Sequence, residues 1–186
     1  MKRPKLLAIV CVAGVLTSCS DSSEATEIAE ESKCPKENNV HLTVEKYGYQ
    51  FDSEFTYNEN FEIKRSDWTQ SSDSAATLSL YNYNQGESGE DNVEIRVEFH
   101  SKNGNKIGPG VYNHTDYQSD YWSKTTIETS NGRVYFNWNM GMPKQGYVEI
   151  IDMNDDEVCG SFNLKVENYK LERIGHVELS GDWSSK

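Results

Sequence analysis

Val93-Glu94-Ile95-Arg96-Val97-Glu98-Phe99-His100 decides the fold class, because apolar residues alternate there with charged or polar ones. Successive side chains of a β-strand point to opposite faces, so a period of two predicts a strand with one buried face and one wet face. An amphipathic helix would instead place its apolar residues three or four positions apart. Residues 133–138 and 158–166 alternate in the same way. The sequence therefore predicts an all-β, antiparallel fold.

Shorter segments of strand character occur along the rest of the chain and are separated by turn signals. The clearest turn is Asn131-Gly132, since both residue types accept the positive φ that a type I′ hairpin requires. The other expected strands cover residues 41–50, 60–65, 76–83, 110–113, 124–129, 147–152 and 174–180. About eight to ten short strands at this spacing predict a β-sandwich, with a β-barrel as the alternative.

The N-terminus has the pattern of an export signal. A short basic start with Lys2, Arg3 and Lys5 precedes an uncharged run from residue 6 to residue 16. That run is shorter than the roughly 20 residues of a membrane span, and it fits the apolar region of a signal peptide. The end of the run, Leu-Thr-Ser-Cys at residues 16–19, resembles the bacterial lipobox. The resemblance implies that residues 1–18 are removed and that Cys19 is acylated; the alternative is an ordinary signal peptide with a chance cysteine.

The mature chain is expected to consist of a flexible acidic tether, residues 19–39, and a single β domain, residues 40–186. The tether is rich in Ser and Glu and has almost nothing apolar to bury. Loss of the three basic residues in the signal peptide lowers the net charge from −12 to −15. A chain of this charge repels nucleic acid, which excludes that partner class. The expected partner is instead membrane lipid, through the acylated Cys19.

Two cysteines remain for the folded domain. Cys11 lies in the signal peptide and Cys19 is assigned to the lipid, which leaves Cys34 and Cys159. In an oxidising compartment thiols pair, so a Cys34–Cys159 disulfide is predicted; two free thiols are the alternative. On its alternating strand Cys159 is expected on the face opposite the apolar residues, where a disulfide would attach the N-terminal segment to the outside of the sheet.

The C-terminal third resembles an uncharacterised family of exported lipoproteins in the Bacteroidota. Its members share a strand of the form G-x-V-x-I, an acidic turn, a strand of the form I-S-G-T-F-x-F and a final G-x-F. Residues 146–150, 152–157, 158–164 and 181–183 are similar in this order, although Cys159 replaces a small residue of the family. The resemblance implies an exported β domain without an established activity, and it supplies no catalytic residue.

The candidate ligand contacts are three aromatic residues, Tyr117, Tyr121 and Trp122, in the polar stretch 116–123. Aromatic rings beside acids and amides suit sugars, because a ring covers the apolar face of a pyranose and the polar groups take its hydroxyls. Ligand sites generally combine apolar walls with a few polar groups. The alternative is that these rings fold inward and belong to the core.

Other polar groups carry weaker signals. The acidic run Asp152 to Glu157 offers oxygen atoms to Ca²⁺, but its order does not fit an EF-hand, and an ordinary hairpin turn is preferred. The four histidines are interpreted as surface strand or turn residues: His41, His100, His114 and His176. No nucleophile elbow, phosphate-binding glycine loop or spaced metal ligands occur in the sequence. We therefore expect no enzyme activity, no cofactor and no metal.

Together these features predict a lipid-anchored protein of the bacterial cell envelope that acts as a non-catalytic binding module for glycan or a protein partner. Ser20 rather than Asp follows Cys19, which favours the outer membrane. The first alternative is a structural or accessory subunit of an envelope complex. The distant alternative is a glycan hydrolase, which would need two carboxylates about 5–9.5 Å apart across one cleft.

Overall fold

The alternating segment 93–100 lies in strand β5 (Val93–Ser101) of the computed structural model. Its apolar residues Val93, Ile95, Val97 and Phe99 are buried, and the residues between them are half-buried or exposed. The alternation in sequence is therefore an alternation of sheet faces, as predicted. The inner face packs against the core, while the outer face keeps its charged groups in water.

The structure describes residues 33–47, 55–130, 132–135, 146–167 and 176–186. The signal peptide, Cys19 and the tether up to residue 32 lie outside the described residues, and so do Asn131 and the parts of expected strands at 48–50, 136–138 and 174–175. Within the described residues, no helix is long and apolar enough to pass through a membrane.

The all-β prediction is confirmed. Around β5 lie β1 (His41–Tyr47), β2 (Phe55–Asn60), β3 (Arg65–Ser72), β4 (Ala75–Tyr81), β6 (Gly110–His114), β7 (Tyr121–Thr129), β8 (Gly132–Tyr135), β9 (Gly146–Met153), β10 (Val158–Glu167) and β11 (His176–Ser185). All pairs are antiparallel except β6 with β7, which run parallel.

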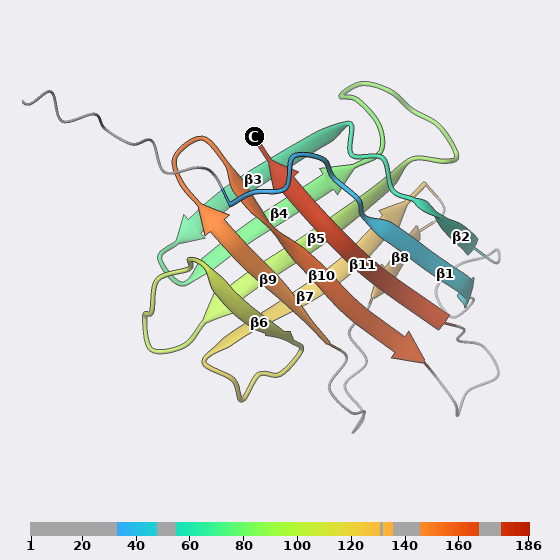
Figure 1. The fold of residues 1–186 in the computed structure, drawn as a ribbon. Coiled ribbons are helices and arrows are strands. Elements are labelled where there is room, and N and C mark those ends of the chain that lie inside the picture. Colours follow the sequence, from blue (N-terminus) through green and yellow to red (C-terminus); the bar gives the residue numbers. More distant parts are fainter. Residues whose placement is uncertain (1–32, 48–54, 131, 136–145, 168–175) are drawn as a thin grey trace, which may run out of the picture. The chain divides into compact units, whose positions relative to one another are not determined.

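The strands form one hydrogen-bonded sheet rather than the two separate sheets of a sandwich. Its order is β2-β1-β11-β10-β9-β6-β7-β5-β4-β3, and β8 pairs with β7 beside this path. The sheet is strongly curled into a half-barrel, so that β9, β10, β11 and β1 cross over β3, β4, β5 and β7 (Figure 1). The preferred sandwich is therefore corrected. The short parallel pair β6–β7 joins the two halves that periodicity alone could not connect.

The inner faces of the two halves share one hydrophobic core. Leu78, Leu80 and Ile95 come from β4 and β5, and Leu42 and Leu179 come from β1 and β11. These side chains are fully buried, and burial of each contributes about 1.5–3 kcal/mol relative to exposure. The curl of the sheet thus lets one sheet cover its own apolar face.

The two edge strands were not expected at their observed positions. A strand was predicted at 60–65, but these residues mostly connect β2 to β3. Both edge strands are polar, and most side chains of β3 are exposed or half-buried. An edge strand that packs little leaves no apolar alternation in the sequence, which is the signal that the prediction used. Trp68 is the main inward contact of β3, with its ring centroid 5.6 Å from that of Phe99.

Residues 33–39, which precede the predicted start of the β domain, contact the end of β11. Asn39 donates its backbone N–H to the Asp182 carbonyl over 3.0 Å, and the Asn38 side-chain oxygen accepts the Ser184 N–H over 2.7 Å. These contacts continue the pairing of β11 beyond the start of β1. The Asp182 carbonyl and the Ser184 N–H of β11 are thereby hydrogen-bonded, so this part of β11 is not an open strand edge.

The predicted disulfide is present. Cys34 and Cys159 are joined, with their Cα atoms 5.5 Å apart. Cys159 is fully buried, because the segment that carries Cys34 covers it. The disulfide therefore fixes residues 33–39 against the start of β10.

Candidate functional site

Two of the three predicted ligand contacts form an aromatic cluster with a histidine. Trp122 lies on the outer face of β7 and stacks on His100 of β5, with ring centroids 4.0 Å apart and an interplanar angle of 15°. Tyr117, from the β6–β7 loop, meets Trp122 edge-on at 4.6 Å. All three side chains are half-buried. We call Tyr117, Trp122 and His100 the aromatic cluster.

The loop beside the cluster is held by its own polar side chains. The Asp116 carboxylate accepts the Gln118 N–H at 3.2 Å and the Ser119 hydroxyl at 2.8 Å. Asn113, which pairs with Trp122 across the β6–β7 ladder, donates its side-chain amide to Ser119 Oγ at 3.1 Å. Such a network orders the loop that carries Tyr117 and holds it beside β7.

Tyr121 lies on the opposite face from Trp122. It packs against the core, and its ring meets Tyr112 edge-on with centroids 5.5 Å apart. The predicted loop at 116–123 ends earlier than expected, because β7 begins at Tyr121 and neighbouring strand residues point to opposite faces. The structure therefore brings Tyr117 and Trp122 together and separates Tyr121 from them.

His100 is the titratable member of the aromatic cluster. Burial lowers its pKa below the ordinary histidine value, and Lys124 acts in the same direction. Glu98, whose carboxylate lies 3.8 Å from the His100 ring nitrogen and 3.7 Å from the Lys124 ammonium, opposes that shift. Neutral His100 stacked on Trp122 is the form that the structure favours at neutral pH.

The other predicted candidates have structural roles. Asn154 accepts the N–H groups of Asp156 and Glu157 at 2.9 Å each, so the acidic run forms the hairpin turn that was preferred over a Ca²⁺ loop. His114 was interpreted as a surface residue, and this is wrong: it is 1% exposed, because it lies on the inner face of β6. His41 and His176 are half-buried on their strands, and His176 lies 3.1 Å from Glu178.

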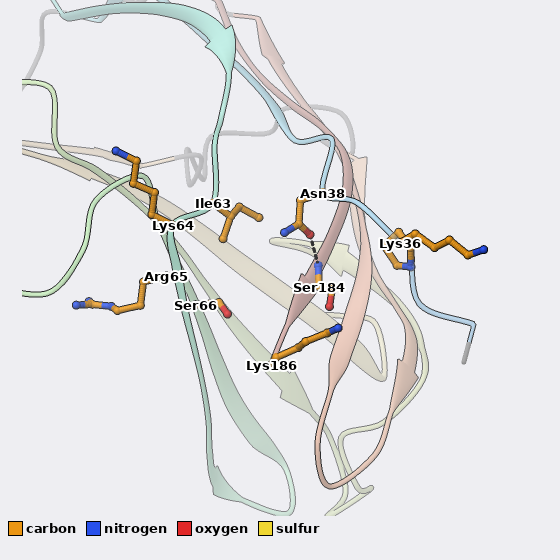
Figure 2. A pocket seen from close by; sticks show the side chains of 9 residues that line it. Lys36, Asn38, Ile63, Lys64, Arg65, Ser66, Ser184 and Lys186 are labelled. Carbon is orange, nitrogen blue, oxygen red and sulfur yellow. Dashed lines mark hydrogen bonds between the residues drawn. The ribbon is translucent and has the colours of Figure 1, made fainter. Parts of the chain in front are cut away.

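A basic cavity is the feature that sequence reasoning missed. It has a volume of about 430 Å³ and lies where the disulfide-linked segment, the β2–β3 connection and the end of β11 meet (Figure 2). Its lining consists of Pro35, Lys36, Asn38, Ile63, Lys64, Arg65, Ser66, Ser184 and Lys186. The lining residues come from three distant parts of the sequence, so no local sequence motif predicts the cavity.

An acidic cavity adjoins the basic one. It has a volume of about 510 Å³ and shares Ser66 and Lys186 with the basic cavity. Its acidic lining comes from β3 and from the β9–β10 turn: Asp67, Asp155, Asp156 and Glu157. Charge of opposite sign is thus segregated along the open edge of β3.

Comparison with known proteins adds no relative to this picture. The chain matches no protein-family model, no curated protein and no solved structure.

Proposed function

We propose that this protein is a lipid-anchored, non-catalytic binding module of the bacterial cell envelope, and that its aromatic cluster binds glycan. The observation that supports the glycan site is the placement of Trp122 on the outer face of the sheet, stacked on His100 and flanked by Tyr117. The N-terminal pattern up to Cys19, and the resemblance to exported lipoproteins of the Bacteroidota, support the anchor and the envelope location.

Sugar recognition fits the chemistry around the aromatic cluster. A half-buried indole that stacks on His100 and meets Tyr117 edge-on is already ordered, so little side-chain entropy is lost when a pyranose stacks on its other face. Asn113, the cross-strand neighbour of Trp122, places its side-chain amide beside the indole, and the amide oxygen can accept a hydrogen bond from a sugar hydroxyl. A protein partner would prefer a wide apolar surface, and among the described residues Val111, at 47% exposure, is the one large hydrophobic residue in the exposed class.

Binding is favoured over hydrolysis because two carboxylates beside the aromatic cluster are already engaged. Asp116 accepts two hydrogen bonds from its own loop, and Glu98 pairs with Lys124 and His100. A glycosidase needs one carboxylic acid free to protonate the leaving oxygen and a second carboxylate facing it. Carboxylates committed to local structure suit a binding surface better.

The test is a glycan screen of the full chain, followed by calorimetry with the best ligand. Trp122→Ala should weaken the affinity about tenfold or more, which corresponds to about 1.4 kcal/mol, because the stacking surface is removed. Tyr117→Ala should weaken it less, since Tyr117 supports the indole edge-on.

Tyr83→Ala is the matched control. Tyr83 is a half-buried tyrosine that also packs edge-on against a ring, here Tyr81 with centroids 5.4 Å apart, but it lies outside the aromatic cluster. Its loss should leave glycan affinity unchanged. The proposal fails if no glycan binds, or if Trp122→Ala binds the ligand as tightly as the unaltered protein.

A further inference from the structure

The basic cavity stands out against the charge of the whole chain. The protein has 18 Lys and Arg residues against 30 Asp and Glu residues. Yet Lys36, Lys64, Arg65 and Lys186 line this one cavity, and no Asp or Glu is among its lining residues. A local excess of cations in an acidic protein focuses a positive potential on the cavity, which attracts an anion.

The four cations differ in their freedom to contact a ligand. The Arg65 guanidinium lies 3.6 Å from the centre of the Tyr81 ring and 3.5 Å from the Asp67 carboxylate, so Arg65 contributes mainly charge. Lys36 and Lys64 are exposed, and neither forms an ion pair within the described parts of the chain, although Lys64 interacts electrostatically with the exposed Glu87. Lys186 pairs with Glu157 at 3.7 Å, but its side chain is 78% exposed, and such surface pairs are weak enough to exchange partners.

Neutral hydrogen-bond donors complete the lining. The Asn38 side-chain oxygen is occupied by the Ser184 N–H, which leaves the amide nitrogen on the other side, facing Ile63 and Lys64 (Figure 2). The Ser66 hydroxyl lies on the same wall of the cavity as Lys64. The lining therefore presents cations and donors, which is the group set that oxyanions bind.

The wall that carries Lys36 and Asn38 is fixed by covalent and hydrogen bonds. The Cys34–Cys159 disulfide holds the segment on β10, and Asn38 holds it on β11. Figure 2 shows Lys36 on one side of the cavity and Lys64 on the other, with Lys186 between them, and the ammonium groups of Lys36 and Lys64 point outward to solvent. Their long flexible stems can turn inward around an ion that enters from solvent.

The neighbouring acidic cavity limits the size of the ligand. An anionic chain that extended past Ser66 would meet Asp67, Asp155 and Glu157. The negative charges of such a chain and of these carboxylates would repel each other. A long polyanion is therefore disfavoured, whereas a compact anion fits.

We propose that the basic cavity binds a small multivalent oxyanion, held by Lys36, Lys64 and Lys186 and by the Asn38 amide. This site is separate from the aromatic cluster, and its test does not depend on the outcome of the glycan experiment. The shared chemistry is two or more negative charges on oxygen atoms within one small molecule. Such charges occur in phosphates and in the several carboxylates of short acidic sugars.

The experiment is titration calorimetry of the full chain, in non-ionic detergent at about 20 mM salt, where electrostatic screening is weak. The two probes are pyrophosphate and digalacturonate, which separate a phosphate source from a sugar-acid source. We expect at least one probe to bind with a stoichiometry of one. Lys36→Gln and Lys64→Gln should each weaken binding about fivefold, as loss of one exposed charge contact implies.

Lys106→Gln is the matched control, because it removes the same charge from an exposed lysine that does not line the basic cavity. It should change the affinity less than twofold, because only the overall charge of the protein changes and no contact of the basic cavity is lost. All three variants alter exposed side chains, so unfolding midpoints should stay equal. The proposal is overturned if neither probe saturates the protein, or if Lys106→Gln weakens binding as much as Lys64→Gln.

Discussion

At the residue scale, Tyr121 and Trp122 show how one position in a strand changes the role of a side chain. The two are neighbours in sequence, yet Tyr121 contacts Tyr112 and the core, whereas Trp122 stacks on His100 on the outer face. Replacing both together would therefore mix a core truncation with a surface change. The aromatic stretch was recognisable in sequence, but the face of each ring depended on where β7 begins.

His100 should make stability depend on pH. Burial lowers its pKa in the folded state, so the unfolded chain takes up the proton first as the pH falls. The contribution of His100 to the free energy of unfolding is therefore constant well above the ordinary pKa of about 6.5. Part of the stability is lost as the pH falls below that value. Urea unfolding at about pH 7.5 and about pH 5.5 should show a smaller acid loss for His100→Gln than for the unaltered protein.

Equal acid losses in the two proteins would contradict this prediction. A direct check is the titration of the His100 ring by NMR, which should give a midpoint below the ordinary histidine value.

At the element scale, the contact between β9 and β10 depends on a glycine at its bulge. The pairing changes register there, since Cys159 pairs with Asp152 but Gly160 pairs with Ile150. This bulge brings the strands together: a Cβ at Gly160 would lie 1.8 Å from the Glu149 carbonyl oxygen and 2.7 Å from Trp183 Cζ2. Only a residue without a side chain fits that approach.

Gly160→Ala should lower the free energy of unfolding by about 3 kcal/mol, since the backbone atom that it meets cannot move aside as a side chain can. Gly108→Ala is the matched control, because no atom lies within 4 Å of its added Cβ. We expect the control to change stability by less than about 1 kcal/mol. Chemical denaturation of both variants provides the comparison, and equal stability of the two would refute the account of the bulge.

At the scale of the whole molecule, the disulfide joins the first described segment to the C-terminal half of the sheet. It spans 125 positions in sequence, so it restricts the unfolded chain strongly. By chain entropy, the double variant Cys34→Ala/Cys159→Ala should lose at most about 4–5 kcal/mol of stability. Urea unfolding without reductant measures this loss, and adding reductant should affect only the unaltered protein. A reductant effect on the double variant would contradict the assignment.

Attachment to the membrane stays a prediction from the N-terminal residues. Cys19→Ala should leave the precursor unprocessed or release the protein in soluble form, because the thiol that accepts the lipid is missing. Acyl chains contribute about 0.8 kcal/mol per buried methylene, so their loss should shift the protein out of the membrane fraction. Membrane fractionation together with mass spectrometry of the N-terminus tests this prediction. Unchanged recovery of the variant in the membrane fraction would contradict lipid anchoring through Cys19.

Local patterns were sufficient for the parts of this fold that are local in origin. Alternation at 93–100 predicted β5 and its buried face, and the turn chemistry around Asn154 predicted a hairpin. The pairing of Cys34 with Cys159 followed from elimination, since only two cysteines remained for the domain. These inferences needed only the periodicity of a strand, the hydrogen bonding of a turn residue and the redox state of a compartment.

The tertiary structure alone decided the rest, because it depended on residues far apart in sequence. The single curled sheet arises from the short parallel contact of β6 with β7, and the edge strand β3 carries no apolar alternation that would announce it. The basic cavity joins Lys36, Lys64 and Lys186 from three separate segments. A sequence pattern records which face of a strand avoids water, but chain closure determines which distant faces and charges meet.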